Sequence, residues 1–435
     1  MGFFDKLFSG KSTNQPNIKF GRYSDAYRSD AQQAAFDQAI EEFEKGRYVR
    51  AYTYFFEFLR DEETDNVRFW EDEKGLRFEL LQGSKKVIGI ADDQRVEVET
   101  KVAIAEKLEV DFMKQLMEKN YSLKYGRFAL DSDNNVIMKF NTFVLDGSPY
   151  KLYDALKEVA TNADKLDDLL LDEFDSLKQV GSGHIIEIEE SEKNTKYKFL
   201  LDSIKNTLHN IQQMPTTSPS INKAYCLMSL CYKLDYLIRP EGFVMEVLER
   251  INRQYFAHDE QTIAAKCRLL IQEFEAIVNR PKVEILKEIY ETTSTFGVTM
   301  PVHHDRVKAF IDGEMPNMEW YIKHKKYDVA LSSASYVVGY CLFNYAVPLP
   351  IRAFFHLYYK ITESNYFVDL GYKLDLYQED LQVFNKKAIT SEINKIVKSH
   401  RKAFPNLNPP IDILDYTNLG TFAQTYLEMI SRLDI

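Results

Sequence analysis

Histidine and carboxylate side chains gather at one point of the sequence, where His303, His304 and Asp305 stand in direct succession. A further histidine, His258, stands upstream next to Asp259. Neutral imidazole and carboxylate oxygens together suit divalent first-row metals. These residue types therefore fit a metal centre whose candidate ligands are His258, His303, His304 and Asp305.

Such a centre would make the second half of the chain similar to metal-dependent phosphohydrolases of the HD type, which place a His, a His-Asp pair and a later Asp on adjacent helices. A later carboxylate is not distinctive here, because Asp312 and Glu314 suit a solvated helix surface equally well. Asp305 itself follows Pro301 near a predicted helix start, where a carboxylate caps backbone N–H groups or favours the helix dipole. A metal-dependent hydrolase is thus an alternative, and our main expectation is no metal and no cofactor.

Nucleophilic catalysis has less support in the sequence. A Gly-x-Ser-x-Gly elbow does not occur. The four cysteines lie among apolar neighbours, and their spacings fit neither a zinc motif nor a redox pair: Cys226, Cys231, Cys267 and Cys341. We expect buried free thiols in a reducing cytoplasm and a protein that is not an enzyme.

The charge balance excludes one class of partner. Asp and Glu number 66 against 55 Lys and Arg, which gives a formal net charge of −11. Non-specific nucleic-acid binding needs cationic side chains that displace counterions, so we expect no nucleic-acid partner. The longest apolar runs are also far shorter than the roughly 20 residues of a membrane span.

Membrane contact would come only from the N-terminus. Phe3, Phe4, Leu7 and Phe8 would share one face of a short helix. A helix of one or two turns buries little apolar surface, so it holds a membrane weakly on its own. A peripheral membrane adaptor is therefore a second alternative.

The hydrophobic pattern divides the chain into an α+β part and an all-helical part. A helical period covers about residues 31–60 with a break at Gly46, and three or four antiparallel strands are expected among 67–70, 76–80, 86–90 and 96–102. A helix over 105–120, a strand hairpin over 121–143 and a helix from Ser148 to about 177 follow. Antiparallel strands divided by helices predict an α+β layer rather than a parallel sheet.

Two breaks set the expected domain boundaries. Gln179–His184 contains Gly181-Ser-Gly183, and Pro215–Pro219 contains two prolines. We therefore expect a tail over 1–19, an α+β domain over 20–178, a linker with one polar helix over 179–219, and an all-helical domain over 220–435.

The order of elements, together with the stretches Val102–Ile104, Phe112–Met117 and Tyr121–Leu130, resembles the type III secretion chaperone-like fold, including its bacterial YbjN-type branch. The resemblance covers about residues 25–178. It implies a small acidic domain that binds other proteins, often as a dimer. The helical part resembles uncharacterised proteins of Bacteroidota-type bacteria in Thr295–Pro301 and Gly339–Asn344, and this second resemblance implies no function.

We therefore predict a non-enzymatic protein-binding factor, chaperone- or adaptor-like, whose sheet takes an extended peptide by strand addition. The candidate interface is the apolar face of the helix over 105–120, which carries Leu108, Phe112, Met113, Leu116 and Met117. Methionine-rich faces suit adaptable contacts. Either this face meets a protein partner, such as a second copy in a homodimer, or it covers the protein's own sheet.

Two charged helices are further candidate surfaces. An acidic face for a basic partner is one interpretation of the first helix, and a solvated face is the other; its acids are Asp154, Glu158, Asp164, Asp167, Asp168, Asp172, Glu173 and Asp175. The second helix is basic and offers the same two interpretations with opposite charge; its cations are Lys386, Lys387, Lys395, Lys398, Arg401 and Lys402.

Overall fold

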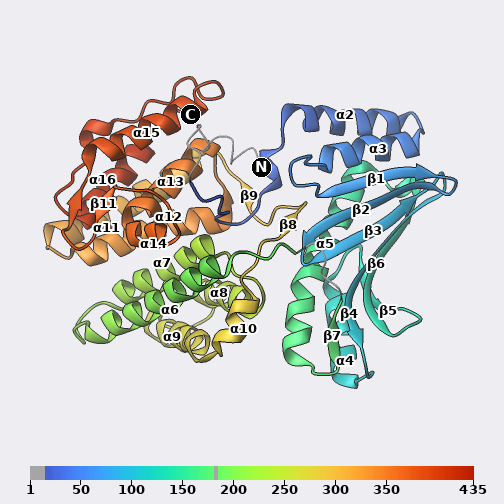
Figure 1. Cartoon of the computed structure of the whole chain (residues 1–435), viewed down its shortest axis with the longest axis horizontal. Coiled ribbons are helices and arrows are strands. Elements are labelled where there is room, and N and C mark those ends of the chain that lie inside the picture. Colours follow the sequence, from blue (N-terminus) through green and yellow to red (C-terminus); the bar gives the residue numbers. More distant parts are fainter. Residues whose placement is uncertain (1–14, 181–184) are drawn as a thin grey trace. The chain divides into compact units, whose positions relative to one another are not determined.

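The computed structural model describes residues 15–180 and 185–435 of the chain. It confirms the predicted fold class, an antiparallel sheet with flanking helices followed by a largely helical region (Figure 1). The predicted N-terminal anchor of Phe3, Phe4, Leu7 and Phe8 and the predicted break at Gly181–Gly183 lie outside the described residues.

A helical hairpin opens the α+β part. Helix α2 (Asp30–Glu44) begins with a capping box, in which the Ser29 and Gln32 side chains bind each other's backbone N–H groups. Gly46 then turns the chain with a φ of +73°, a left-handed conformation that glycine adopts without a steric penalty. Helix α3 (Tyr48–Leu59) follows and buries Phe55 and Phe56 completely, so the hairpin is anchored through its second helix.

The sheet has the order β1-β2-β3-β4-β6-β5, and all these neighbours pair antiparallel. Two short strands lie off this path, because β7 pairs with β4 and β8 pairs with β2. The strands are β1 (Val67–Asp72), β2 (Gly75–Gly83), β3 (Lys85–Ala91), β4 (Arg95–Ala105), β5 (Arg127–Leu130), β6 (Asn135–Phe143), β7 (Leu177–Gln179) and β8 (Thr293–Ser294).

One face of the sheet is apolar and covered. Helix α5 (Pro149–Glu173) packs on β2, β3, β4 and β6, and α3 packs on β1 and β2. Phe78 and Val98 point into this core, which also holds Phe112 from helix α4 (Val110–Ser122). The opposite face carries ion pairs between neighbouring strands, such as Lys139 Nζ to Glu99 Oε2 at 2.9 Å. Buried and exposed residues alternate along the strands, as in a sheet with one buried face and one polar face.

The helical region forms its own core from helices and short strand pairs. The helices are α6 (Glu190–Gln213), α7 (Ser220–Ile238), α8 (Gly242–Tyr255), α9 (Ile263–Asn279), α10 (Lys282–Lys287), α11 (His304–Lys323), α12 (Tyr327–Asn344), α13 (Leu349–Thr362), α14 (Ser364–Asp369), α15 (Lys386–His400) and α16 (Leu419–Ser431). The strands are β9 (Met300–Pro301), which pairs with β10 (Tyr345–Ala346), and β11 (Tyr377–Gln378), which pairs with β12 (Val383–Phe384). Short 3₁₀ turns complete the fold at Asp25–Tyr27, Val144–Asp146 and Ile411–Ile413.

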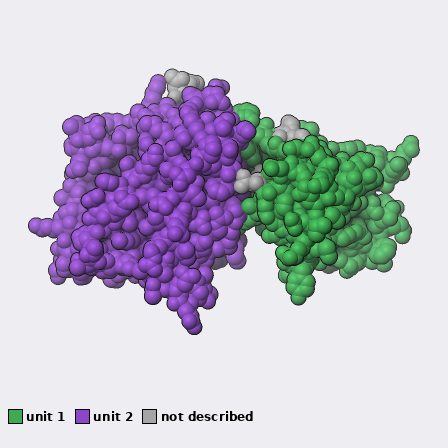
Figure 2. Space-filling model, turned by 90° about the horizontal axis from the view of Figure 1, so that it is seen from below, with its two compact units in different colours: residues 1–4, 23–187, 290–298 green, residues 5–22, 188–289, 299–435 purple. Residues whose placement is uncertain are grey.

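The chain divides into two compact units (Figure 2). Each unit is built from several separate stretches of the sequence. Of the described residues, unit 1 contains 23–180, 185–187 and 290–298, and unit 2 contains 15–22, 188–289 and 299–435. This division differs from the expected one, which placed 179–219 in a linker. Helix α6 belongs to unit 2, where it packs on α7 and α9 and buries Leu200 and Ile204 completely.

Helices that could cross a bilayer are absent from the ranges 15–180 and 185–435, since none combines sufficient length with sufficient apolar character.

Candidate protein-binding site

The five residues predicted for the binding face divide between core and surface. Phe112 is fully buried and packs edge-on against Phe174, with ring centroids 6.0 Å apart. Leu116 is also buried. Leu108, Met113 and Met117 are exposed. The five residues therefore do not form one face. Phe112 and Leu116 belong to the core, and only Leu108, Met113 and Met117 are available to a partner.

The exposed side of α4 carries further apolar residues that the sequence did not assign to it. Val110, Met117 and Tyr121 are 79, 73 and 96% exposed, and their spacing of seven and four residues places them on one side of the helix. Met113 borders this row, and Leu108 precedes the helix. We call Leu108, Val110, Met113, Met117 and Tyr121 the α4 patch.

Hydrogen bonds hold the C-terminal end of α4 in place. The Asn120 carboxamide donates from Nδ2 to the Phe128 carbonyl at 3.0 Å and accepts from the Phe128 N–H at 2.6 Å. The Glu158 carboxylate accepts three backbone N–H groups, from Lys124, Tyr125 and Gly126, at 2.9, 2.8 and 2.7 Å. The α4 patch is therefore presented by a helix whose exit is fixed to both β5 and α5.

The acidic helix α5 uses part of its charge inside unit 1. Besides Glu158, Asp164 accepts the Ser84 N–H at 2.6 Å, and Glu173 accepts from the Gln115 side chain at 2.8 Å. Asp154, by contrast, is exposed. The acidic run is thus a mixture of internal acceptors and solvated groups rather than one uniform docking face.

The basic helix α15 is amphipathic. Its isoleucines Ile389, Ile393 and Ile396 are buried, while its cations are exposed. Only Lys395 forms an ion pair with a described acid, from Nζ to Glu392 Oε1 at 2.5 Å. The basic side chains therefore form a solvated face over an apolar contact.

The histidine cluster does not assemble in the structure. His258 is exposed in the loop between α8 and α9, and His303 and Asp305 are exposed at the start of α11. His304 is buried, and burial lowers its pKa. In the described part of the chain, no three His, Cys, Asp or Glu side chains lie close enough together to hold a metal. Asp305 stands in the first turn of α11, where its charge favours the helix dipole.

The four cysteine thiols are free; three are buried, and Cys226 is partly buried. Burial is the main cause that raises the pKa of each: Cys226, Cys231, Cys267 and Cys341. Because the thiolate is the nucleophile, a raised pKa makes these sulfurs poor candidates for catalysis.

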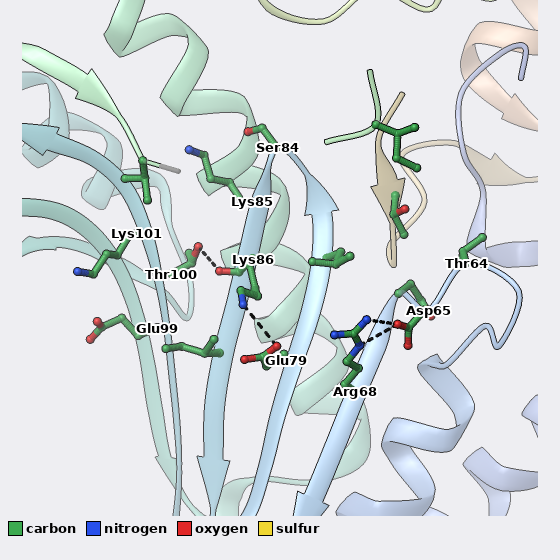
Figure 3. Close-up of a pocket in the computed structure, with 16 residues that line it drawn as sticks. Thr64, Asp65, Arg68, Glu79, Ser84, Lys85, Lys86, Glu99, Thr100 and Lys101 are labelled. Atoms are coloured by element: carbon green, nitrogen blue, oxygen red, sulfur yellow. Dashed lines mark hydrogen bonds and ion pairs between the residues drawn. The ribbon is translucent and has the colours of Figure 1, made fainter. Parts of the chain in front are cut away.

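A groove of about 650 Å³, lined by charged and apolar side chains, lies on the uncovered face of the sheet (Figure 3). Its opposite charges are paired: Lys86 Nζ on β3 lies 3.5 Å from Glu79 Oε2 on β2, and Arg68 binds Asp65, three residues before it. Thr100 Oγ1 donates to the Lys86 carbonyl at 3.0 Å. Because these cations and acids neutralise each other, the groove has no strong preference for an ion of either sign.

The sequence analysis missed two residues of the patch: Val110 lay inside the predicted helix but was not assigned to its apolar face, and Tyr121 lay beyond the predicted end of the helix. Tyr121 was assigned to the following strand, whereas α4 continues to Ser122. The only available signal was their spacing from Met113 and Met117, which continues the helical period by one turn in each direction.

Comparison with known proteins adds no relative: neither a protein-family model nor a curated protein matches the chain.

Proposed function

We propose that the chain is a non-enzymatic protein-binding factor, chaperone- or adaptor-like, which binds a partner protein through the α4 patch. The observation that carries this proposal is the exposed row of Val110, Met117 and Tyr121 on a helix whose other side is already buried. Contiguous exposed apolar residues on a protein surface mark interaction sites.

The composition of the patch supports a protein partner. Tyrosine contributes a large ring with a polar end, and such residues dominate the energetics of protein interfaces. Methionine is flexible and polarisable, so it fits partner surfaces of different shape. Burying one such side chain fully contributes about 1.5–3 kcal/mol, which makes the patch sufficient for a modest interface.

The folding of unit 1 does not require these residues to be apolar. Phe112 and Leu116 already supply the contact between α4 and the core. Val110 and Tyr121 point away from that contact and gain nothing from it. Contact with another molecule would therefore explain why Val110 and Tyr121 are apolar.

The resemblance to type III secretion chaperone-like and YbjN-type domains supports the same function, because it implies protein binding, often as a dimer. A second copy of the chain is accordingly one partner that the α4 patch would suit. We place the activity in the cytoplasm, where free thiols persist.

Site-specific photo-crosslinking in cells tests the proposal. A photoreactive phenylalanine analogue at Met117 should give a discrete protein adduct, whereas the same analogue at Lys119, exposed on the opposite side of α4, should not. Adding Val110→Glu should abolish the adduct. Equal adducts from both positions, or none from either, would contradict the proposed surface.

A further inference from the structure

Residues 290–298 contribute a strand to unit 1, although they lie in the sequence between two stretches of unit 2. Strand β8 pairs antiparallel with the end of β2, through Ser294 opposite Gln82 and Thr293 opposite Gly83. Strand β1 pairs with β2 only as far as Leu80. The segment therefore covers the part of the β2 edge that β1 leaves open.

Unit 1 binds the backbone of this segment through one buried side chain. Gln82 accepts on Oε1 from the N–H groups of Thr295 and Phe296, at 3.2 and 2.9 Å, and donates from Nε2 to the Phe296 carbonyl at 3.4 Å. Arg28 donates to the Thr295 carbonyl at 3.0 Å. These bonds recognise an extended backbone, whichever protein supplies it.

The side chains of the segment are recognised as well. Thr295 Oγ1 donates to the Leu81 carbonyl at 2.9 Å and accepts from Asn66 Nδ2 at 3.2 Å. Both Thr295 and Asn66 are almost completely buried. A residue without a hydroxyl at this position would leave the Asn66 donor without this bond, which is costly in a buried site.

The next two residues complete a short sequence preference. The Phe296 ring is fully buried and lies edge-on to Tyr153, with centroids 5.4 Å apart. A Cβ on Gly297 would stand 2.6 Å from the backbone N and the Oδ1 of Asp25, so a larger residue requires that turn to move. The site thus selects the order Thr-Phe-Gly.

We propose that this is a peptide-recognition site of unit 1, that the chain's own residues 293–297 occupy it, and that an extended Thr-Phe-Gly segment of a partner protein competes for it. The inference rests on the proposed protein-binding function and names the kind of peptide that unit 1 takes. The strand ladder between β8 and β2 has only two residue pairs, much shorter than the five or six residues typical of a strand. The segment is therefore held mainly through Thr295 and Phe296, whose contacts a competing peptide with the same residues would reproduce.

The occupying segment acts as a built-in competitor. Tethered at both ends, it faces the site at an effective concentration of the order of millimolar. The apparent affinity for a free peptide is therefore the affinity of the empty site multiplied by the fraction of time for which the site is empty. In the resting chain this site is closed to a competing peptide, and withdrawal of residues 293–297 opens it.

The test uses the full chain and a fluorescein-labelled octapeptide with the sequence of residues 291–298. Fluorescence anisotropy should show that a chain with Thr295→Ala and Phe296→Ala binds this peptide at least about tenfold more tightly than the wild type does, because the site is then vacated. Val298→Ala, which changes an exposed residue of the same segment, should bind like the wild type. An octapeptide with alanine in place of its phenylalanine should not bind, and Gln82→Leu in the vacated chain should abolish binding.

Failure of the inference is distinguishable from failure of the proposed function. Equal peptide affinity for the vacated chain and the wild type, with native near-ultraviolet circular dichroism in both, would reduce the site to an internal core contact and overturn the inference. If the double variant unfolds, Thr295→Val provides the same comparison with a milder change. No gain in peptide affinity in that variant would also overturn the inference. A wild-type dimer that the double variant abolishes would assign the site to a second copy instead of a foreign peptide. Crosslinks from Met117 report on the α4 patch and are expected in every one of these variants.

Discussion

Arg22 and Asp235 form a buried ion pair that joins the first described segment to α7 in unit 2. The guanidinium donates from Nη2 to Asp235 Oδ1 at 2.7 Å and from Nε to Oδ2 at 3.0 Å. A third bond runs from Nη1 to Glu249 at 3.1 Å, and the Phe343 ring lies 4.1 Å from the guanidinium carbon. Arg22 thus fixes the point at which the chain leaves unit 2 for unit 1.

Arg22→Ala should destabilise unit 2 by about 3 kcal/mol, because it leaves the carboxylate of Asp235 buried without its main partner. Urea denaturation followed by circular dichroism measures the change. Arg432→Ala is the matched control, since Arg432 pairs with Glu428 at an exposed position and its loss should change little. Equal effects of the two substitutions would show that the Arg22 pair does not stabilise unit 2.

His356 should make the stability of unit 2 depend on pH. Burial lowers its pKa well below the ordinary 6.5, and the nearby cations Lys360 and Arg352 lower it further. The unfolded state therefore binds a proton more readily than the folded state. The contribution of neutral His356 is fully present above the unfolded pKa and is lost as pH falls below about 6.5.

Denaturation midpoints at pH 7.5 and pH 5.5 measure this dependence. His356→Gln should reduce the loss of stability between the two pH values, while a substitution of exposed His258 should leave it unchanged. An unaltered pH dependence in the His356 variant would mean that other groups cause it.

Glu158 should be more important for stability than its neighbour on the same helix. Its carboxylate accepts three consecutive backbone N–H groups in the turn before β5. Glu158→Ala leaves these donors without an acceptor, and we expect a loss of about 2 kcal/mol in unit 1. Asp154→Ala, at an exposed position of α5, is the control and should be neutral. Thermal unfolding of the two variants makes the comparison, and a neutral Glu158→Ala would show that water replaces the carboxylate.

Local hydrophobic period was sufficient to predict most elements of unit 1. The alternation of Val96, Val98 and Thr100 indicated β4, and the structure contains that strand with those residues buried. The pairing of Ser294 with Gln82 had no such signal, because two residue pairs between distant segments leave no periodic pattern. Long-range pairing is set by side chains such as Asn66, whose partner lies in another part of the chain.

The candidate site was predicted only in part for a similar reason. A helical period identifies which residues share a face, but both a core contact and an interface produce apolar residues. Phe112 and Met117 therefore had the same signature in the sequence. Tertiary packing distinguishes them, since Phe112 meets Phe174 and Met117 meets solvent.

This difference gives opposite predictions for two substitutions on one helix. Phe112→Glu should unfold unit 1, because even truncation of a buried phenylalanine to alanine costs about 3–5 kcal/mol and a buried carboxylate adds to that loss. Met117→Glu should leave the fold intact, because this side chain is largely exposed. Circular dichroism and urea denaturation distinguish the two outcomes.

Sedimentation velocity then tells which partner the α4 patch meets. If the partner is a second copy, the wild type should dimerise at micromolar concentration, and Met117→Glu should be a folded monomer. Lys119→Glu, a charge change on the other side of α4, should still dimerise. A wild type that stays monomeric at high micromolar concentration rules out the homodimer and leaves a different protein as the partner. A dimer that persists in Met117→Glu would place the self-association surface elsewhere, because a carboxylate in an apolar interface loses its hydration without gaining a partner.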